Sequence, residues 1–219
     1  MTPADDQREH WSATLAAHPE MYGDEPSEAA VAAADVFAAA GATTVLELGA
    51  GQGRDTLYLA RRGLHIHALD YAPEGLDAIE AKAGAAGLAD RVTVEIHDVR
   101  QRLPVADAGV DASYSHMLLC MALTTPELER LVAELRRVVR PGGLVVYTAR
   151  TTDDAHYGAG IAHGDDMYEH GGFVVHFFDR ALIDRLASGF TLVDVTEFTE
   201  GELPRRLVRV TMRRPLGRV

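Results

Sequence analysis

The sequence predicts an α/β protein built on an open, mostly parallel β-sheet with helices on both faces. Apolar, strand-like runs alternate along the chain with helix-like segments, which is typical of right-handed βαβ units. The first run, at residues 43–48, leads into a turn with three glycines, and acidic residues follow the next two runs. Ligands of such sheets bind at the carboxyl ends of the strands, so these features are expected to share one edge.

The composition indicates a single globular domain, because 219 residues with 47% hydrophobic content can bury one substantial core. There are 21 Lys and Arg residues against 33 Asp and Glu, a formal net charge of -12. This charge repels phosphate backbones and anionic lipid surfaces, so we expect neither a nucleic-acid nor a membrane partner. Cys120, the single cysteine, cannot form an internal disulfide, and the first residues lack a signal-peptide pattern. We therefore expect a cytoplasmic protein.

Residues 1–40 predict an N-terminal arm followed by a helix. The arm is polar with two large aromatics, Trp11 and Tyr22, and a short helix is expected over residues 11–18. Such an arm either closes over a ligand site or covers a sheet edge, and the residues alone favour neither interpretation. An alanine-rich helix follows, with Ser27 placed as its N-cap and Gly41 just past its end.

Residues 41–149 predict the core of the sheet. The expected strands are residues 43–48, 64–69, 92–96, 110–115 and 144–148, and the expected helices are residues 55–62, 73–86 and 126–139. Because parallel strands end at a common edge, four polar residues at or just after strand ends should lie together. These are Glu47, Asp70, Asp98 and His116.

The remaining chain predicts an insertion and a closing unit. Residues 150–178 are rich in Gly, Asp and His and too long for an ordinary connection, so we interpret them as a lid or substrate wall. Residues 179–219 begin with Asp179 as the cap of a helix over residues 180–187. Two alternating apolar runs, 190–198 and 207–212, then predict an antiparallel hairpin with its turn at Gly201–Pro204.

The glycine-rich turn has an informative spacing. Gly49, Gly51 and Gly53 occupy alternate positions, which permits a sharp turn and close approach of a ligand to the backbone. The dinucleotide fingerprint needs its third glycine five residues after the first, where Arg54 stands, so the spacing weakens a nicotinamide interpretation. Taken alone, the turn is equally compatible with a ligand site and with a tight turn.

Four motifs together resemble the class I S-adenosylmethionine-dependent methyltransferases. They are the run Glu47–Gly53, Asp70 after the second strand, Asp98 after the third, and the turn Arg140–Gly143. The resemblance covers about residues 40–150 and implies a Rossmann-like, seven-stranded sheet whose last strand is antiparallel. It also implies S-adenosyl-L-methionine as cofactor.

The resemblance assigns cofactor-binding roles to nine residues. These are Glu47, Gly49, Gly51, Gly53, Asp70, Tyr71, Asp98, Val99 and His116. It implies that Asp70 holds the ribose hydroxyls, that Tyr71 packs on the adenine, and that Asp98 accepts from the adenine amine. Charge supports this independently, since the cofactor carries a sulfonium and a carboxylate can accept two hydroxyl hydrogens. For either acid alone, capping of the following helix is the simpler explanation.

Methyl transfer from a sulfonium is an in-line displacement, which the protein assists mainly by alignment and by excluding water. A histidine could take the proton of a hydroxyl or ring-nitrogen acceptor, whereas a thiol ionises readily. We therefore predict a small-molecule acceptor with a thiol, hydroxyl or heterocyclic nitrogen. His116 is the candidate catalytic residue, with a hydrogen-bonded structural role as its alternative.

The acceptor pocket is predicted from aromatic, sulfur and histidine side chains outside the motifs. The candidate substrate residues are Trp11, Tyr22, Met117, Cys120, Tyr157, His170 and His176. The run Ser115–Leu118 lacks the motif of DNA amino-methyltransferases, and one cysteine does not suit arsenite methylation. The histidines of residues 156–176 match no familiar metal spacing, so no metal is predicted. A non-catalytic, cofactor-binding or regulatory protein of the same fold stays the alternative, and a homodimer is possible through the arm or the insertion.

Overall fold

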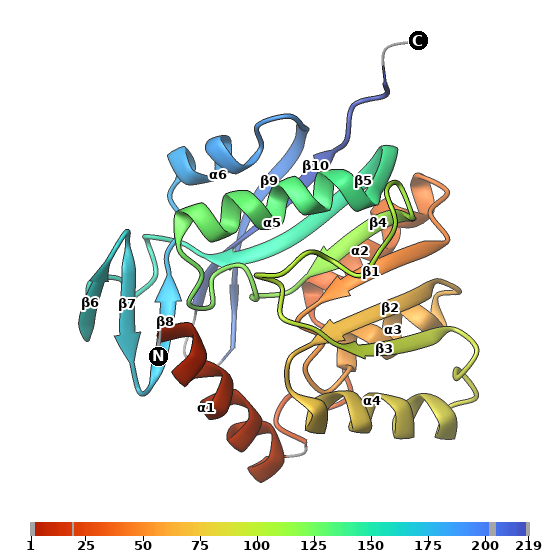
Figure 1. The fold of residues 1–219 in the computed structure, drawn as a ribbon, viewed down its shortest axis with the longest axis horizontal. Coiled ribbons are helices and arrows are strands. Elements are labelled where there is room, and N and C mark those ends of the chain that lie inside the picture. The colour runs from red at the N-terminus through yellow and green to blue at the C-terminus, as the bar shows by residue number, and fades with distance from the viewer. Residues whose placement is uncertain (1–2, 19, 202–204, 218–219) are drawn as a thin grey trace.

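Seven strands form one sheet in the computed structural model, which describes residues 3–18, 20–201 and 205–217 (Figure 1). The strand order is β3-β2-β1-β4-β5-β10-β9. The bounds are β1 (Thr44–Leu48), β2 (His65–Asp70), β3 (Val92–Ile96), β4 (Val110–Ser115), β5 (Val139–Arg150), β9 (Thr191–Glu200) and β10 (Arg205–Arg213). Strands β1 to β5 pair in parallel, whereas β10 is antiparallel to both β5 and β9. The predicted α/β, Rossmann-like fold with an antiparallel last strand is confirmed.

Helices cover both faces of the sheet. One face carries α2 (Glu28–Ala39), α3 (Arg54–Arg61) and α4 (Pro73–Ala85), and the other carries α5 (Thr125–Val138) and α6 (Arg180–Leu186). Figure 1 shows α5 and α6 lying together along one side of the sheet. Alternate strand residues face opposite sides, so two apolar clusters form. Leu46 and Val145 pack with α5, whereas Val45 and Val146 pack with the helices of the opposite face.

Helix termini follow the local signals of the sequence. The Ser27 side chain accepts a hydrogen bond from Ala30 N and caps α2, and Gly41 has a φ of 65° just after that helix. The Asp179 side chain accepts from Leu182 N and caps α6. These three predictions are confirmed, because capping depends on residues close together in the chain.

The N-terminal helix is longer than predicted. Helix α1 spans Pro3–Ala17 rather than residues 11–18. Tertiary contacts explain the difference, since the Gln7 side chain accepts from Val174 N at 2.7 Å and Trp11 packs on Phe173. Figure 1 shows α1 running from the strand β8 (Phe173–His176) toward α4.

The insertion contains a small sheet of its own, which the sequence analysis did not predict. Strands β6 (Ile161–Gly164), β7 (Met167–His170) and β8 pair antiparallel in this order. Strand β8 is tied to the main body by a hydrogen bond from His176 N to Cys120 O at 2.9 Å. The insertion therefore forms a wall beside the carboxyl edge of the main sheet.

The closing hairpin pairs β9 with β10 in the predicted antiparallel manner. Its turn was predicted at Gly201–Pro204, of which residues 202–204 lie outside the described part of the chain. Strand β5 begins at Val139 rather than at residue 144, because its pairing with β4 continues across an irregularity before Leu144. No helix in the described residues is long and apolar enough to cross a membrane.

Asp111 ties together the opposite, amino-terminal ends of three central strands. Its Oδ2 accepts from Thr43 N at 2.7 Å and Thr44 N at 3.0 Å, and its Oδ1 accepts from Arg140 Nε at 2.6 Å. Burial alone would raise the pKa of Asp111, but these donors outweigh it and hold the pKa below its ordinary value. The ionised carboxylate is therefore the form that stabilises the fold.

We predict that Asp111→Ala lowers the free energy of unfolding by about 1 to 3 kcal/mol at pH 7, since it leaves several donors unpaired. A lowered pKa adds stability above the ordinary Asp pKa of about 4, and this contribution is lost as the pH falls below it. The difference between wild type and variant in urea unfolding should therefore shrink below about pH 4. Asp77→Ala, on the exposed side of α4, is the control. Equal stabilities at pH 7 would contradict this role.

Candidate functional site

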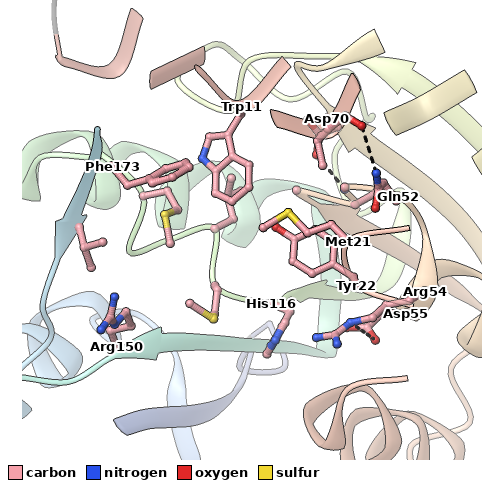
Figure 2. Close-up of a pocket in the computed structure, with 18 of the residues that line it drawn as sticks. Trp11, Met21, Tyr22, Gln52, Arg54, Asp55, Asp70, His116, Arg150 and Phe173 are labelled. Carbon is pink, nitrogen blue, oxygen red and sulfur yellow. Dashed lines mark hydrogen bonds and ion pairs between the residues drawn. The ribbon is translucent and has the colours of Figure 1, made fainter. Parts of the chain in front are cut away.

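A cavity of about 470 Å³ opens at the carboxyl edge of the sheet (Figure 2). Its walls come from the turns after β1, β2 and β4, from α1, from the small sheet, and from the ends of β5 and β9. Figure 2 shows two ends, with Asp70, Gln52 and Asp55 on one side and Phe173 and Arg150 on the other. His116 lies between them.

The glycine turn forms the floor at the first end. Gly49, Gly51 and Gly53 all have positive φ, of 72°, 55° and 84°. A Cβ on Gly53 would lie 2.5 Å from Ile79 Cγ1, so this glycine is required by packing. A Cβ on Gly51 would meet nothing nearer than Tyr22 Cε2 at 3.8 Å, so this glycine opens onto the cavity.

Two buried acids at the end of β1 and the start of α3 have opposite environments. The Asp55 carboxylate accepts from Ser27 N at 2.8 Å, Ser27 Oγ at 2.7 Å and Tyr114 OH at 2.9 Å. Glu47 also lines the cavity, but its Oε2 has no hydrogen-bond partner among the described residues. Burial raises the pKa of Glu47 to about 8. Burial thus favours the protonated form of Glu47 as long as no cation lies beside it, and a cationic group of a ligand would favour the ionised form.

Asp70 joins the second strand to the glycine turn. Its Oδ2 accepts from Gly51 N and its Oδ1 from Ala72 N, both at 2.9 Å. Burial raises the pKa of Asp70 in spite of these hydrogen bonds. The N-cap residue of α4 is Ala72, and no side chain caps this helix. Asp70 is therefore not its N-cap, which was the alternative explanation for an acid at this position.

Asp98 is placed differently from the other predicted cofactor residues. Its carboxylate accepts from Arg100 Nε at 3.0 Å and from Arg100 Nη2 at 2.6 Å. Burial would raise the pKa of Asp98, but the Arg100 hydrogen bonds hold it below the ordinary value. Tyr71 and Val99 line the cavity, whereas Asp98 does not. Its predicted contact with an adenine amine stays a prediction.

His116 is part of a charged network across the middle of the cavity. Its Nε2 lies 3.1 Å from Glu200 Oε2, and the other oxygen of Glu200 accepts from Arg54 Nη2 at 3.2 Å. An ionised carboxylate only accepts hydrogen bonds, so Nε2 carries a proton and donates. The Nδ1 atom lies 2.9 Å from Thr148 Oγ1, so both ring nitrogens have partners.

Glu200 holds this network in its ionised form. Burial would raise its pKa, but His116 and Arg54 outweigh that effect and lower the pKa of Glu200 to about 2. Sequence reasoning missed Glu200 and Arg54 as a pair, because 146 positions separate them. The only available signal was that Glu200 lies two residues after the predicted strand at residues 190–198.

The second end of the cavity is aromatic. Four of the predicted substrate residues line the cavity: Trp11, Tyr22, Met117 and His170. The Trp11 ring packs against Phe173 with their centroids 4.7 Å apart. Sequence reasoning also missed Gln52 and Arg150 as lining residues, although Gln52 lies within the glycine turn and Arg150 lies two residues after the predicted strand at residues 144–148.

Three predicted substrate residues do not line this cavity. Cys120 is fully buried, and its Sγ donates a hydrogen bond to Met117 O at 3.2 Å. Burial raises the pKa of its thiol to about 11. His176 is buried, with its Nδ1 on Leu123 O at 2.7 Å. Tyr157 is 38% exposed and donates to Asp166. Their contacts lie within the insertion and the loop of residues 117–123 beside it, and their substrate roles stay predictions.

Among the described residues, no group of three or more His, Cys, Asp or Glu side chains is placed to hold a metal ion. The four histidines of the insertion are dispersed. His163 pairs with Glu169, His176 is buried, and His156 stacks on His170 at 5.0 Å. These contacts account for the histidine-rich composition of the segment in structural terms.

Comparison with known proteins identifies the core. Residues 45–143 match the family model described as a methyltransferase domain. These residues form a class I S-adenosylmethionine-dependent methyltransferase domain. An uncharacterized methyltransferase of Mycobacterium tuberculosis is 35% identical over 122 residues, which cover 56% of this chain and 46% of that protein. The matched part therefore spans about half the length of this relative.

Solved structures show that the fold of the methyltransferase domain extends over nearly the whole chain. A Burkholderia thailandensis 1,6-didemethyltoxoflavin-N1-methyltransferase has a TM-score of 0.75 at 20% identity, over 97% of this chain and 88% of that one. The [4+2]-cyclase SpnF has a TM-score of 0.71 at 17% identity, over 99% and 98% of the two chains. The arm and the insertion thus belong to the same architecture as the core.

We predict different costs for alanine at two glycines of the turn, both of which have positive φ. Gly53→Ala should lower the free energy of unfolding by about 1 to 3 kcal/mol more than Gly51→Ala, because only its Cβ collides with the buried Ile79. The backbone cost of a left-handed alanine, about 1 kcal/mol, is common to both variants. Urea unfolding measures both values, and equal losses would contradict the packing argument.

Proposed function

We propose that this chain transfers a methyl group from S-adenosyl-L-methionine to a small-molecule nucleophile. The observation that carries the proposal is the continuous cavity of the methyltransferase domain, which has the glycine turn and two acids at one end and an aromatic chamber at the other. Its volume of about 470 Å³ lies in the range of small-molecule sites. We propose that residues 1–219 act as one domain.

The residues at the first end fit the cofactor. The unpartnered Glu47 Oε2 offers a site for an ammonium group, and Gly51 leaves space where any side chain would project. Asp70 is held at the end of β2 by backbone donors, in position to accept from ribose hydroxyls. Tyr71 and Val99 supply apolar surface for adenine. When bound, S-adenosylmethionine supplies an electrophilic methyl group on a sulfonium.

The chain itself contributes alignment and shielding. Trp11, Tyr22 and Phe173 cover the aromatic chamber from α1, its following loop and β8, and so exclude water from an acceptor. We propose the N-terminal arm and the insertion as these covers. The acceptor atom is a thiol, hydroxyl or heterocyclic nitrogen.

His116 is proposed as a positioning residue. Its Nε2 donates to Glu200 and its Nδ1 faces Thr148, so neither nitrogen presents a free lone pair to an acceptor. Through these contacts it fixes the end of β4 against β5 and β9. This is the hydrogen-bonded alternative to a general base, and it agrees with a reaction that depends mainly on alignment.

The direct test is isothermal titration with S-adenosylmethionine, followed by a screen of thiol, phenol and heterocycle acceptors for formation of S-adenosylhomocysteine. Binding with turnover of one acceptor class supports the proposal. Binding without turnover across the panel would favour a non-catalytic, cofactor-binding protein. The structurally similar SpnF is named as a [4+2]-cyclase, so proteins of this fold are not all named as methyltransferases. Failure to bind would overturn both.

We predict that Asp70→Ala weakens binding of S-adenosylmethionine by about 1 to 3 kcal/mol, because the ribose hydroxyls lose a charged acceptor. Asp77→Ala, exposed on the neighbouring helix α4, should leave the affinity unchanged. Isothermal titration gives both affinities, and circular dichroism checks the fold. An unchanged affinity in folded Asp70→Ala would refute the ribose assignment.

We predict that His116→Ala lowers turnover about 10- to 100-fold with little change in cofactor affinity, because misplacement near the reacting atoms is costly. His116→Gln can still donate to Glu200 and should retain most of the turnover. If His116 were the general base, both variants would lose turnover equally and the pH profile of kcat would lose a limb. Turnover measured from pH 6 to 9 distinguishes these results.

A further inference from the structure

Arg150 is a buried cation in the wall of the aromatic chamber. It is the last residue of β5, its side chain is 8% exposed, and it lines the cavity. Figure 2 shows it at the end of the cavity opposite Asp70. The desolvation penalty of a buried ion pair is about as large as the attraction between its charges. The ion pair with Asp154 therefore does not by itself explain, through stability, why an arginine is buried here.

Asp154 fixes the orientation of Arg150. The carboxylate accepts from Arg150 Nε at 3.2 Å and from Arg150 Nη2, and its side chain is 1% exposed. Backbone donors hold the carboxylate itself, with His156 N at 2.9 Å and Arg206 N at 2.8 Å. Arg150 Nη2 also donates to His156 Nδ1 at 3.0 Å.

These contacts leave one edge of the guanidinium unused. Nε has one hydrogen and Nη2 has two, and all three are accounted for by Asp154 and His156. No hydrogen bond from Nη1 occurs within the described part of the chain. The Arg150 Cζ atom also lies over the Phe177 ring, 5.3 Å from the ring centroid, a cation–π contact that favours this position of the guanidinium. Two N–H donors are thus held beside a chamber lined mainly by apolar and aromatic side chains.

The surroundings define the shape of a matching ligand. Trp11 and Phe173 form an aromatic wall, and Met117 and Met121 supply adaptable apolar surface. Flat, polarisable molecules suit such walls. The charge of Arg150 is already neutralised by Asp154, and Glu200 also lines the cavity, so a full negative charge on the ligand gains little.

We propose that Arg150 is a specificity-determining residue, whose Nη1 edge binds an uncharged carbonyl oxygen on a planar aromatic or heteroaromatic methyl acceptor. This inference rests on the proposed function, because the ligand is a methyl acceptor only if the chain transfers methyl groups. It deepens that function by naming the chemical class of the acceptor. Asp154 is the positioning residue that keeps the donor edge directed into the chamber.

The test uses matched pairs of bicyclic heterocycles on the full chain, with and without saturating S-adenosylhomocysteine. Each pair is a ring lactam and its carbonyl-free parent, such as isoquinolin-1-one with isoquinoline and quinolin-2-one with quinoline. Isoquinoline-1-carboxylate and quinoline-2-carboxylate serve as negatively charged comparison ligands. Ligand-observed NMR gives the dissociation constants. Wild type should bind lactams about tenfold more tightly than their parents, as expected for a hydrogen bond from a charged donor.

Two variants assign the preference to Arg150. Arg150→Lys keeps a charge beside Asp154 but lacks the planar fork. The double variant Arg150→Met with Asp154→Asn removes both charges and keeps an oxygen for the backbone donors. In both, the lactam preference should fall to within twofold while the parents bind as in wild type. Unchanged S-adenosylhomocysteine affinity and melting temperature show that the fold is intact.

A preference for carboxylates over lactams, the absence of any lactam preference in wild type, or a preference that survives in the folded variants would each overturn the inference. Failure of the proposed function gives a different result. In that case wild type does not bind S-adenosylhomocysteine, whereas the lactam preference and its loss in the variants are still measured without it.

Discussion

The hydrogen bond from Gly51 N to Asp70 Oδ2, 2.9 Å long, links the two features on which the site depends. One is the turn that ends β1, and the other is the acid that ends β2. The parallel pairing of these strands places both ends at one edge, with Leu48 opposite Leu69. The backbone of the turn must therefore take left-handed conformations that only glycine adopts at low cost, and the acid fixes them.

This constraint explains why the first end of the cavity could be predicted from the sequence. Strand periodicity, glycine spacing and an acid directly after a strand are each contained in a few neighbouring residues, as are the caps at Ser27 and Asp179. Parallel topology then brings such local signals together without further information. Asp98 shows the limit of this reasoning, because the same local rule placed it at the edge but could not show that Arg100 occupies its carboxylate.

The second end could not be predicted in the same way. Its walls come from α1, the insertion and the tip of β9, which meet only through long-range contacts such as Gln7 with Val174. Strands of four residues carry too little alternation to be recognised, and β6 is exposed along its whole length. Cys120 was predicted to line the acceptor pocket, yet its thiol donates to the Met117 carbonyl and the residue does not line the cavity.

The two ends nevertheless share one physical feature, an unsatisfied polar group beside a satisfied neighbour. At the first end Asp55 has three donors, whereas Glu47 Oε2 has no partner within the described residues. At the second end, Arg150 Nε and Nη2 are paired, whereas Nη1 makes no hydrogen bond within the same residues. A buried polar atom without a partner costs about 1 to 3 kcal/mol, so Glu47 Oε2 lowers the stability of the fold unless a ligand pairs with it. The unpaired atoms offer a ligand an acidic group at one end and a donor at the other. Under the proposed function and the proposed role of Arg150, a ligand of matching polarity pairs with each atom, and the cavity selects a different partner at each of its two ends.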